Sequence, residues 1–300
     1  MKRGYNSMIE WPDLLIDAIA RRRCVLFLGS GISANARNVD GKKPPTWAEF
    51  LKTILKKEEK KLQNVQDLLN KLINNDDFLM ACEVIINTIG ENAFAEIVAD
   101  EFRRPRYKYS DVHKLIFGLD SRIVVTPNID KIYEQYALHE SDSTIVVKSY
   151  YDNDIAKYIR SKDYILIREH GYVDEASRMI FTQKQYNIAR CQYRTFYDLM
   201  DALILTHTFI FLGCGINDPD IKLVLENSNF LHCGCNPHYF VTEKGSFELE
   251  IANVLRSNRN LEFLEYDNSD GTHSRLVENL NKLNELVDDE RKRISDQQSW

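Results

Sequence analysis

The sequence predicts an α/β protein with a doubly wound, mostly parallel sheet. Short apolar runs rich in β-branched residues recur along the chain, each bounded by Gly, Pro, Asn or a charged residue. Most of these runs are apolar at every position, which is typical of strands that helices cover on both faces. Stretches with helical periodicity separate them, and strands that alternate with helices indicate a parallel sheet.

The predicted elements follow in chain order. The strands are CVLFLG (24–29), IVVTPN (123–128), TIVVKSY (144–150), YILIREHG (164–171), TFIFLGCG (208–215), HYFVTE (238–243) and LEFLEY (261–266). Helical patterns include KIYEQYALH (131–139), NIARCQYRTFYDLMDALILT (187–206) and SFELEIANVLRS (246–257). We therefore expect one domain over residues 1–300.

Two long stretches add helices to this core. Residues 46–118 show helical periodicity and no convincing strand, which predicts a helical module inserted after the first strand. A C-terminal helix is expected within 271–300, where Leu276, Leu280, Leu283 and Val287 form one apolar stripe. The stripe indicates core packing, with an oligomer contact as the alternative.

Composition narrows the class of protein. The chain has 300 residues, of which 44% are hydrophobic, and a formal net charge of −6. An acidic chain is not expected to bind nucleic acid directly, because phosphates require a basic surface. No apolar run reaches the length of about 20 residues that spans a bilayer, and the N-terminus lacks a signal-peptide pattern, so we expect a cytoplasmic protein.

The cysteine pattern offers little support for a metal or a disulfide framework. Six cysteines occur without a C-x-x-C pair. The segment HCGCNPH, from His232 to His238, holds two thiols and two imidazoles, but its C-x-C spacing is tight for zinc. We interpret it as a turn before a strand and expect no metal.

A glycine turn directly follows the first strand and matches G-x-G-x-x-G/A. Such turns let the backbone approach a pyrophosphate, and the amides of a helix N-terminus add donors. An ordinary nicotinamide-binding unit would continue to a second strand that ends in Asp or Glu about 20 residues later. This chain has helices there, which weakens the dehydrogenase interpretation. The residues of the turn are Gly29, Ser30, Gly31, Ile32, Ser33 and Ala34.

A second glycine turn, with Gly213, Gly215, Asn217 and Asp218, follows a later strand. Two such turns indicate two backbone approaches to one extended ligand. The alternative is that each turn merely joins a strand to a helix, with Asp218 or Asp220 capping the second of these helices.

Polar residues also follow two of the central strands. Asn128 and Asp130 come after IVVTP, and His170 comes after YILIRE. Asn128 or Asp130 is either a helix cap or a partner for ribose hydroxyls and a carboxamide. Glu169 should point away from His170, because side chains alternate along a strand.

These segments together resemble the sirtuin superfamily. GSGIS resembles its first glycine turn, TPNID its T-x-N-x-D motif, REHG its catalytic histidine and GCGINDPD its second glycine turn. The resemblance covers roughly residues 24–243 and implies a sirtuin-like Rossmann variant with NAD as the ligand.

Departures from that family indicate one of its branches. The chain lacks the two C-x-x-C pairs of the zinc ribbon and the G-I-P-D-F-R segment of protein-deacylating sirtuins. PPTWAEFL and FLGCGINDPDI look instead like zinc-free sirtuin-like domains of bacterial antiphage systems. That resemblance implies hydrolysis of NAD to nicotinamide and ADP-ribose, with depletion of NAD during infection.

The resemblance also implies roles for individual residues. Asn128 would hold the nicotinamide ribose or the attacking water, and Ile129 and Asp130 would face the carboxamide. His170 would bond the ribose hydroxyls and act as a general base or orienting group. The two glycine turns would bind the rest of NAD, and no metal would take part.

A freely active hydrolase of this kind would kill its host, which predicts a switch through self-assembly or a partner. Because the catalytic domain occupies nearly the whole chain, we expect a separate regulatory protein. We also expect the chain to form a homo-oligomer. A HerA-type hexameric ATPase is the first expectation and an Argonaute-like protein the second. The alternatives for the chain's own activity are a sirtuin-type protein-lysine deacylase and a non-catalytic NAD or ADP-ribose sensor.

Overall fold

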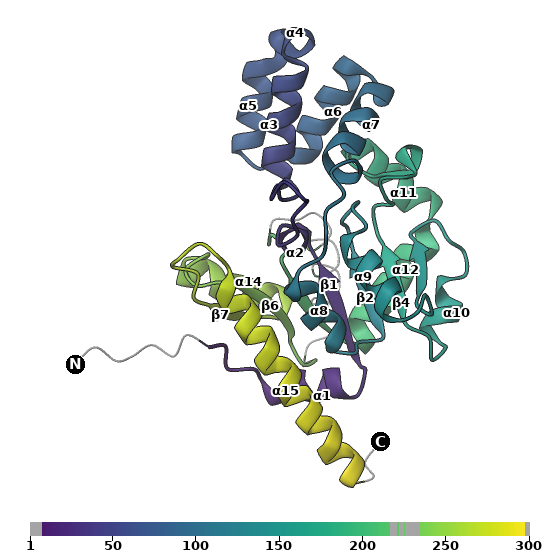
Figure 1. The fold of residues 1–300 in the computed structure, drawn as a ribbon, viewed down its shortest axis with the longest axis vertical. Helices are drawn as coiled ribbons and strands as arrows, with labels where there is room; N and C mark the ends of the chain where they lie inside the picture. Colours follow the sequence, from purple (N-terminus) through teal and green to yellow (C-terminus); the bar gives the residue numbers. More distant parts are fainter. Residues whose placement is uncertain (1–7, 217–220, 222–224, 226–233, 298–300) are drawn as a thin grey trace, which may run out of the picture.

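The computed structural model describes residues 8–216, 221, 225 and 234–297, and it contains a seven-stranded sheet in which every strand pairing is parallel. The strand order is β3-β4-β2-β1-β5-β6-β7. Helices flank the sheet (Figure 1), so the predicted fold class is confirmed. The strands are β1 (Cys24–Leu28), β2 (Ile123–Thr126), β3 (Val146–Ser149), β4 (Ile165–Arg168), β5 (Thr208–Leu212), β6 (His238–Glu243) and β7 (Leu261–Tyr266).

The central strand β1 shows why the sequence forms a sheet with helices on both faces. All of its residues are buried, and they alternate between two cores on opposite faces of the sheet. Cys24, Leu26 and Leu28 face the first core, whereas Val25 and Phe27 face the second. A strand without a polar face is stable only where helices cover both sides of the sheet.

The helices of the sheet region lie before, between and after the strands.

The predicted helix over 187–206 is wrong in one respect, because the chain breaks at Tyr193 and forms two helices. Tyr193 has φ −114° and ψ 38°, and its ring packs edge to face on Tyr150 at 5.1 Å. The helices are α1 (Asp13–Ala20), α2 (Ser30–Ser33), α9 (Ile132–Glu140), α10 (Ile155–Ile159), α11 (Gln183–Gln192), α12 (Arg194–Thr206), α14 (Leu249–Arg259) and α15 (Ser274–Asp296), with a 3₁₀ turn at Ala176–Arg178.

A helical segment lies between β1 and β2. Its helices α3 to α7 gather at one end of the molecule (Figure 1) around a third apolar core. Its last helix, α8, packs instead on α15 and α9. The elements are α3 (Trp47–Lys57), α4 (Glu59–Leu62), a 3₁₀ turn (Gln63–Val65), α5 (Gln66–Asn74), α6 (Phe78–Ile89), α7 (Glu91–Val98), a π-turn (Ala99–Arg103) and α8 (Asp111–Gly118). The division into one domain with an insertion over 46–118 stays a prediction.

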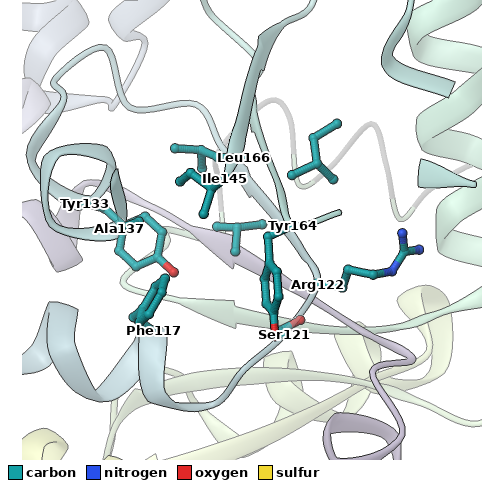
Figure 2. A pocket seen from close by; sticks show the side chains of 10 residues that line it. Phe117, Ser121, Arg122, Tyr133, Ala137, Ile145, Tyr164 and Leu166 are labelled. Carbon is teal, nitrogen blue, oxygen red and sulfur yellow. The ribbon is translucent and has the colours of Figure 1, made fainter. Parts of the chain in front are cut away.

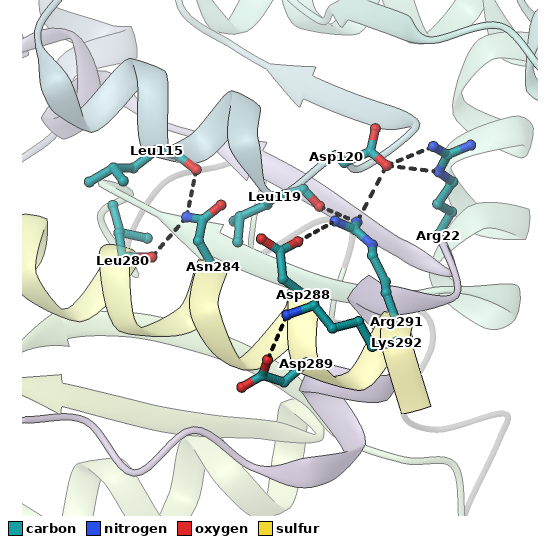
Figure 3. Close-up of polar contacts among 10 residues, drawn as sticks. All are labelled: Arg22, Leu115, Leu119, Asp120, Leu280, Asn284, Asp288, Asp289, Arg291 and Lys292. Atoms are coloured by element: carbon teal, nitrogen blue, oxygen red, sulfur yellow. Dashed lines mark hydrogen bonds and ion pairs between the residues drawn. The ribbon is translucent and has the colours of Figure 1, made fainter. Parts of the chain in front are cut away.

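Helix α15 packs on α1 and α8 along its predicted apolar stripe. Leu276 is 5% exposed and Leu280, Leu283 and Val287 are fully buried, so the stripe is core packing within the chain. Figure 3 shows the polar contacts along its border. Asn284 donates to the Leu115 carbonyl at 3.0 Å, and Arg291 donates to the Leu119 carbonyl at 2.8 Å.

No described helix is by itself long and apolar enough to cross a membrane. The bent pair Phe78–Ile89 and Glu91–Arg103 meets the length and composition limits together, but it turns by 119° between its two halves.

Two buried histidines should make the fold acid-labile. Burial lowers the pKa of His113 and of His238 to about 4, against about 6.5 in an unfolded chain. Below pH 6.5 the unfolded chain therefore binds protons that the folded chain does not. The free energy of unfolding should fall between pH 6.5 and pH 4, by at most about 1.4 kcal/mol per pH unit for each histidine.

The substitution His238→Asn isolates this effect. The Nδ1 atom of His238 accepts a hydrogen bond from the Phe209 N–H at 3.1 Å, and the Asn carbonyl oxygen takes a similar place. Urea unfolding at several pH values should give a shallower pH slope for the variant than for wild type. An unchanged slope would contradict the prediction.

Candidate functional site

The large cavity of the described chain lies at the carboxyl edge of the sheet and has a volume of about 850 Å³. Residues that follow β1, β2, β4, β5 and β6 line it, together with residues of the helical segment. This volume is within the usual range for ligand sites, about 300–1,000 Å³. A cavity at the other end of β2 and β4, drawn in Figure 2, has only about 20 Å³, room for little more than a water molecule.

The position of the large cavity follows from the strand order. From β1 the chain continues to β2 on one side, whereas β5 lies on the other side of β1. Loops that leave two neighbouring strands in opposite directions open a crevice at their carboxyl ends, where α/β proteins bind ligands.

The two glycine turns interlock at this switch point. The Gly29 N–H donates to the Leu212 carbonyl at 2.9 Å, and the Gly31 N–H donates to the Gly213 carbonyl at 2.8 Å. A Cβ on Gly29 would lie 2.4 Å from the Gly213 oxygen. These glycines therefore let two main-chain segments touch. The amide of Gly31 is already bonded within the protein, so it differs from the free phosphate donor that the motif predicts.

Gly213 should be the most sensitive of these positions. Its φ is +65°, and an added Cβ would meet the Ile32 nitrogen at 2.5 Å. We expect Gly213→Ala to lower the free energy of unfolding by about 2–4 kcal/mol, because it combines left-handed backbone with a clash. The matched control is Gly215→Ala, which meets nothing within 4 Å and should be nearly neutral. Thermal and urea unfolding measure both, and equal stability of the two variants would refute the interlock as the reason for glycine.

Asn128 connects the loop after β2 to the first glycine turn. Its Nδ2 atom donates to the Gly29 carbonyl at 2.9 Å and to Ser33 Oγ at 3.1 Å. Two acceptors around Nδ2 fix the orientation of the amide. Its Oδ1 atom is thereby left as an acceptor at the cavity, which Asn128 lines.

Ser33 extends this contact to Asp130. The hydroxyl of Ser33 accepts from Asn128 and bonds to the Asp130 carboxyl. Burial raises the pKa of that carboxyl, and its hydrogen bonds to the Ile132 N–H and to Ser33 act in the opposite direction. The 3.0 Å bond from the Ile132 N–H also shows that Asp130 fixes the start of α9. Asp130 is thus both a turn residue and a lining residue of the cavity.

His170 lines the cavity although it is only 5% exposed. Its Nε2 atom lies 2.6 Å from the Tyr186 hydroxyl, and the two rings meet edge to face at 5.1 Å. Gly171 has φ +74°, and a Cβ there would meet the Arg178 carbonyl at 2.6 Å. Glycine at this position therefore lets the chain turn directly after His170.

The structure brings most predicted site residues together. Seven line the cavity: Ser30, Ser33, Asn128, Ile129, Asp130, His170 and Gly215. Gly29, Gly31, Ile32 and Gly213 form the interlocked turns beneath it. Asn217 and Asp218 lie outside the described residues. Glu169 is buried and is not among the lining residues of the cavity. Burial of Tyr197 raises the pKa of its hydroxyl, and the charge of Glu169 raises it further.

Within the described part of the chain, no three His, Cys, Asp or Glu side chains gather as metal ligands. His238 lies in β6, where its Nδ1 atom is bonded to a backbone N–H, and Cys235 is exposed. His232 and Cys233 lie outside the described residues, so a metal at this segment stays untested.

Sequence reasoning missed an aromatic group at the cavity. Trp47, to which the sequence assigns no role, lines it together with Phe78, Phe181 and Tyr186. Tyr186 had a usable signal, because Thr182 and Gln185 form a capping box that starts α11 just before it. Trp47 also follows the first residue of a capping box, formed by Thr46 and Glu49, but only the fold brings α3 to the sheet edge.

A doubly wound parallel sheet with glycine turns and a cavity at its switch point defines a Rossmann-type α/β protein. Residues 122–264 match the family model of the SIR2-like domain. This part of the chain is therefore similar to the SIR2-like domain.

Curated relatives are similar over most of the chain. NAD(+) hydrolase ThsA of Enterococcus faecium is 24% identical over 76% of the chain and 45% of the relative. NAD(+) hydrolase ThsA of Acinetobacter baumannii (strain 532279) is 22% identical over 71% of the chain and 40% of the relative. Defense-associated sirtuin 2 of Bacillus subtilis is 22% identical over 73% of the chain and 20% of the relative. The chain spans less than half the length of these relatives.

Proposed function

We propose that the protein is an NAD+ glycohydrolase that converts NAD+ to nicotinamide and ADP-ribose. The observation that supports this most is the meeting of Asn128, Asp130 and His170 on one cavity at the switch point of a SIR2-like fold. The relatives named NAD(+) hydrolase support the same reaction.

The reaction breaks the bond between nicotinamide N1 and ribose C1′. The bonding electrons pass to N1, which neutralises the ring, and C1′ acquires oxocarbenium character. Water then adds to C1′ and releases a proton. Asn128 Oδ1 is an acceptor at the cavity, suited to a ribose hydroxyl or to this water. His170, paired with Tyr186, would orient the ribose and accept the proton.

Asp130 and Ile129 would hold the leaving group. A carboxyl at the cavity can accept a hydrogen bond from the carboxamide NH₂, and the Ser33 bond keeps Asp130 in place. Ile129 is only 7% exposed and belongs to the third apolar core, so it gives the ring a rigid apolar contact.

We further propose that the enzyme acts in the cytoplasm as the effector of a bacterial antiphage system that depletes NAD. Uncontrolled hydrolysis would kill the host, so the activity requires a switch. We propose a homo-oligomer controlled by a partner protein, with a HerA-type ATPase as the first candidate and an Argonaute-like protein as the second. The relative named defense-associated sirtuin supports the biological role.

The test follows nicotinamide and ADP-ribose release from NAD+ by the purified protein, alone and with the products of neighbouring genes. Release of both products in equal amounts supports a hydrolase. Deacylation of an acetyl-lysine peptide coupled to nicotinamide release would favour the deacylase alternative. Binding of NAD+ without product under every condition would favour a sensor.

A further inference from the structure

One wall of the cavity is aromatic and comes largely from the helical segment. Trp47, the first residue of α3, is parallel to Phe78, the first residue of α6, with an interplanar angle of 5° and centroids 5.9 Å apart. Trp47 also meets Phe181 edge to face at 5.6 Å. All three side chains line the cavity. We call these three residues the aromatic wall.

The aromatic wall is directly connected to His170. Phe181 follows Ile180, whose N–H donates to the His170 carbonyl at 3.2 Å. Five residues later, Tyr186 contacts the His170 ring. The wall therefore lies beside the part of the cavity where the glycosidic bond would be broken.

The charged side chains that line the cavity are acidic. Its lining includes the acidic residues Asp76, Asp77, Asp130 and Glu243, and no Lys or Arg is among the lining residues of the described chain. An aromatic face attracts a cation through its quadrupole, and nearby carboxylates add to that attraction. The wall thus suits a flat aromatic ring that carries a positive charge.

We propose that the aromatic wall, through Trp47, holds the positively charged nicotinamide ring of NAD+ and makes the site select the oxidised over the reduced dinucleotide. The inference rests on the proposed function and names which form of the substrate the site takes. The reduced ring is neutral and puckers, so it loses both the cation–π attraction and part of the flat contact. Because the ring of NAD+ becomes neutral as its bond breaks, the contact strengthens substrate binding rather than the transition state.

A binding experiment tests the wall without any turnover. The chain has three tryptophans, Trp11, Trp47 and Trp300. Trp11 is 7% exposed and donates to the Asn279 carbonyl at 3.2 Å, so it is shielded from small molecules. In the Trp300→Phe protein, the cation 1-methylnicotinamide should quench tryptophan emission saturably, and NAD+ should compete with it. The same quenching in Trp300→Phe/Trp47→Phe protein would overturn the inference.

Kinetics supply the second test. Trp47→Leu should raise KM for NAD+ by about tenfold and leave kcat within about threefold, whereas inhibition by NADH should stay unchanged. Trp47→Phe retains a ring and should fall between wild type and Trp47→Leu. Equal loss of affinity for NAD+ and NADH, or a fall in kcat at constant KM, would overturn the inference.

The hydrolase proposal and the aromatic-wall proposal can be refuted independently of each other. If NAD+ protects Trp47 from quenching but no product forms under any condition, the hydrolase proposal falls and the wall stands. If hydrolysis proceeds and Trp47 is neither quenched nor required, the wall falls and the hydrolase stands.

Discussion

Asn128→Ala should reduce NAD+ hydrolysis at least about 100-fold, because it removes an acceptor from the cavity and the amide that bridges Gly29 and Ser33. The measurement is initial-rate kinetics on protein with a cooperative unfolding transition. We expect the loss mainly in kcat, since the ribose or water that Asn128 positions reacts only when aligned.

Asn35→Ala is the matched control for that substitution. The Asn35 amide donates to the Gly31 carbonyl at 2.8 Å and so supports the same turn, but Asn35 is not among the lining residues of the cavity. It should retain activity within a few-fold. Equal losses in the two variants would mean that Asn128 acts only by supporting the turn.

His170→Ala should likewise lower kcat by about 100-fold to 10,000-fold, the usual contribution of a general acid or base. Tyr186→Phe separates the histidine from its partner, because it keeps the edge-to-face ring contact and removes the hydroxyl 2.6 Å from Nε2. We expect this variant to lose about tenfold in kcat and to shift the pH profile of kcat.

The control for the histidine experiment is His238→Asn, which changes a buried histidine of β6 that does not line the cavity. Near-normal activity is expected there at neutral pH. A His170→Ala protein that keeps wild-type kcat would exclude the proposed general base, and an unshifted pH profile in Tyr186→Phe would exclude its influence on His170.

The fold could be predicted in outline because its strands are apolar at almost every position. All seven predicted strands are present, and the turns that end β1 and β5 lie where the glycines indicated. The ends of the helices were harder to predict from the sequence. The break at Tyr193, for example, depends on ring packing against Tyr150, which lies in a distant part of the chain.

The candidate site was predictable where its residues directly follow strands. Asn128, Asp130 and His170 leave the sheet at one edge, so their meeting follows from the parallel arrangement alone. The aromatic wall was not predictable, because Trp47 and Phe78 reach the cavity only through the packing of α3 on α6. The roles assigned to the individual site residues stay predictions.

The interlocked glycine turns also determine when the site can exist during synthesis. The turn after β1 leaves the ribosome early, but the main chain that holds it belongs to β5 and its turn, which are made much later. Pairing so distant in sequence forms late and cooperatively. A nascent or truncated chain that ends before β5 therefore lacks the shaped crevice. Under the proposed hydrolase function, unfinished copies of the chain would therefore be inactive because of topology alone.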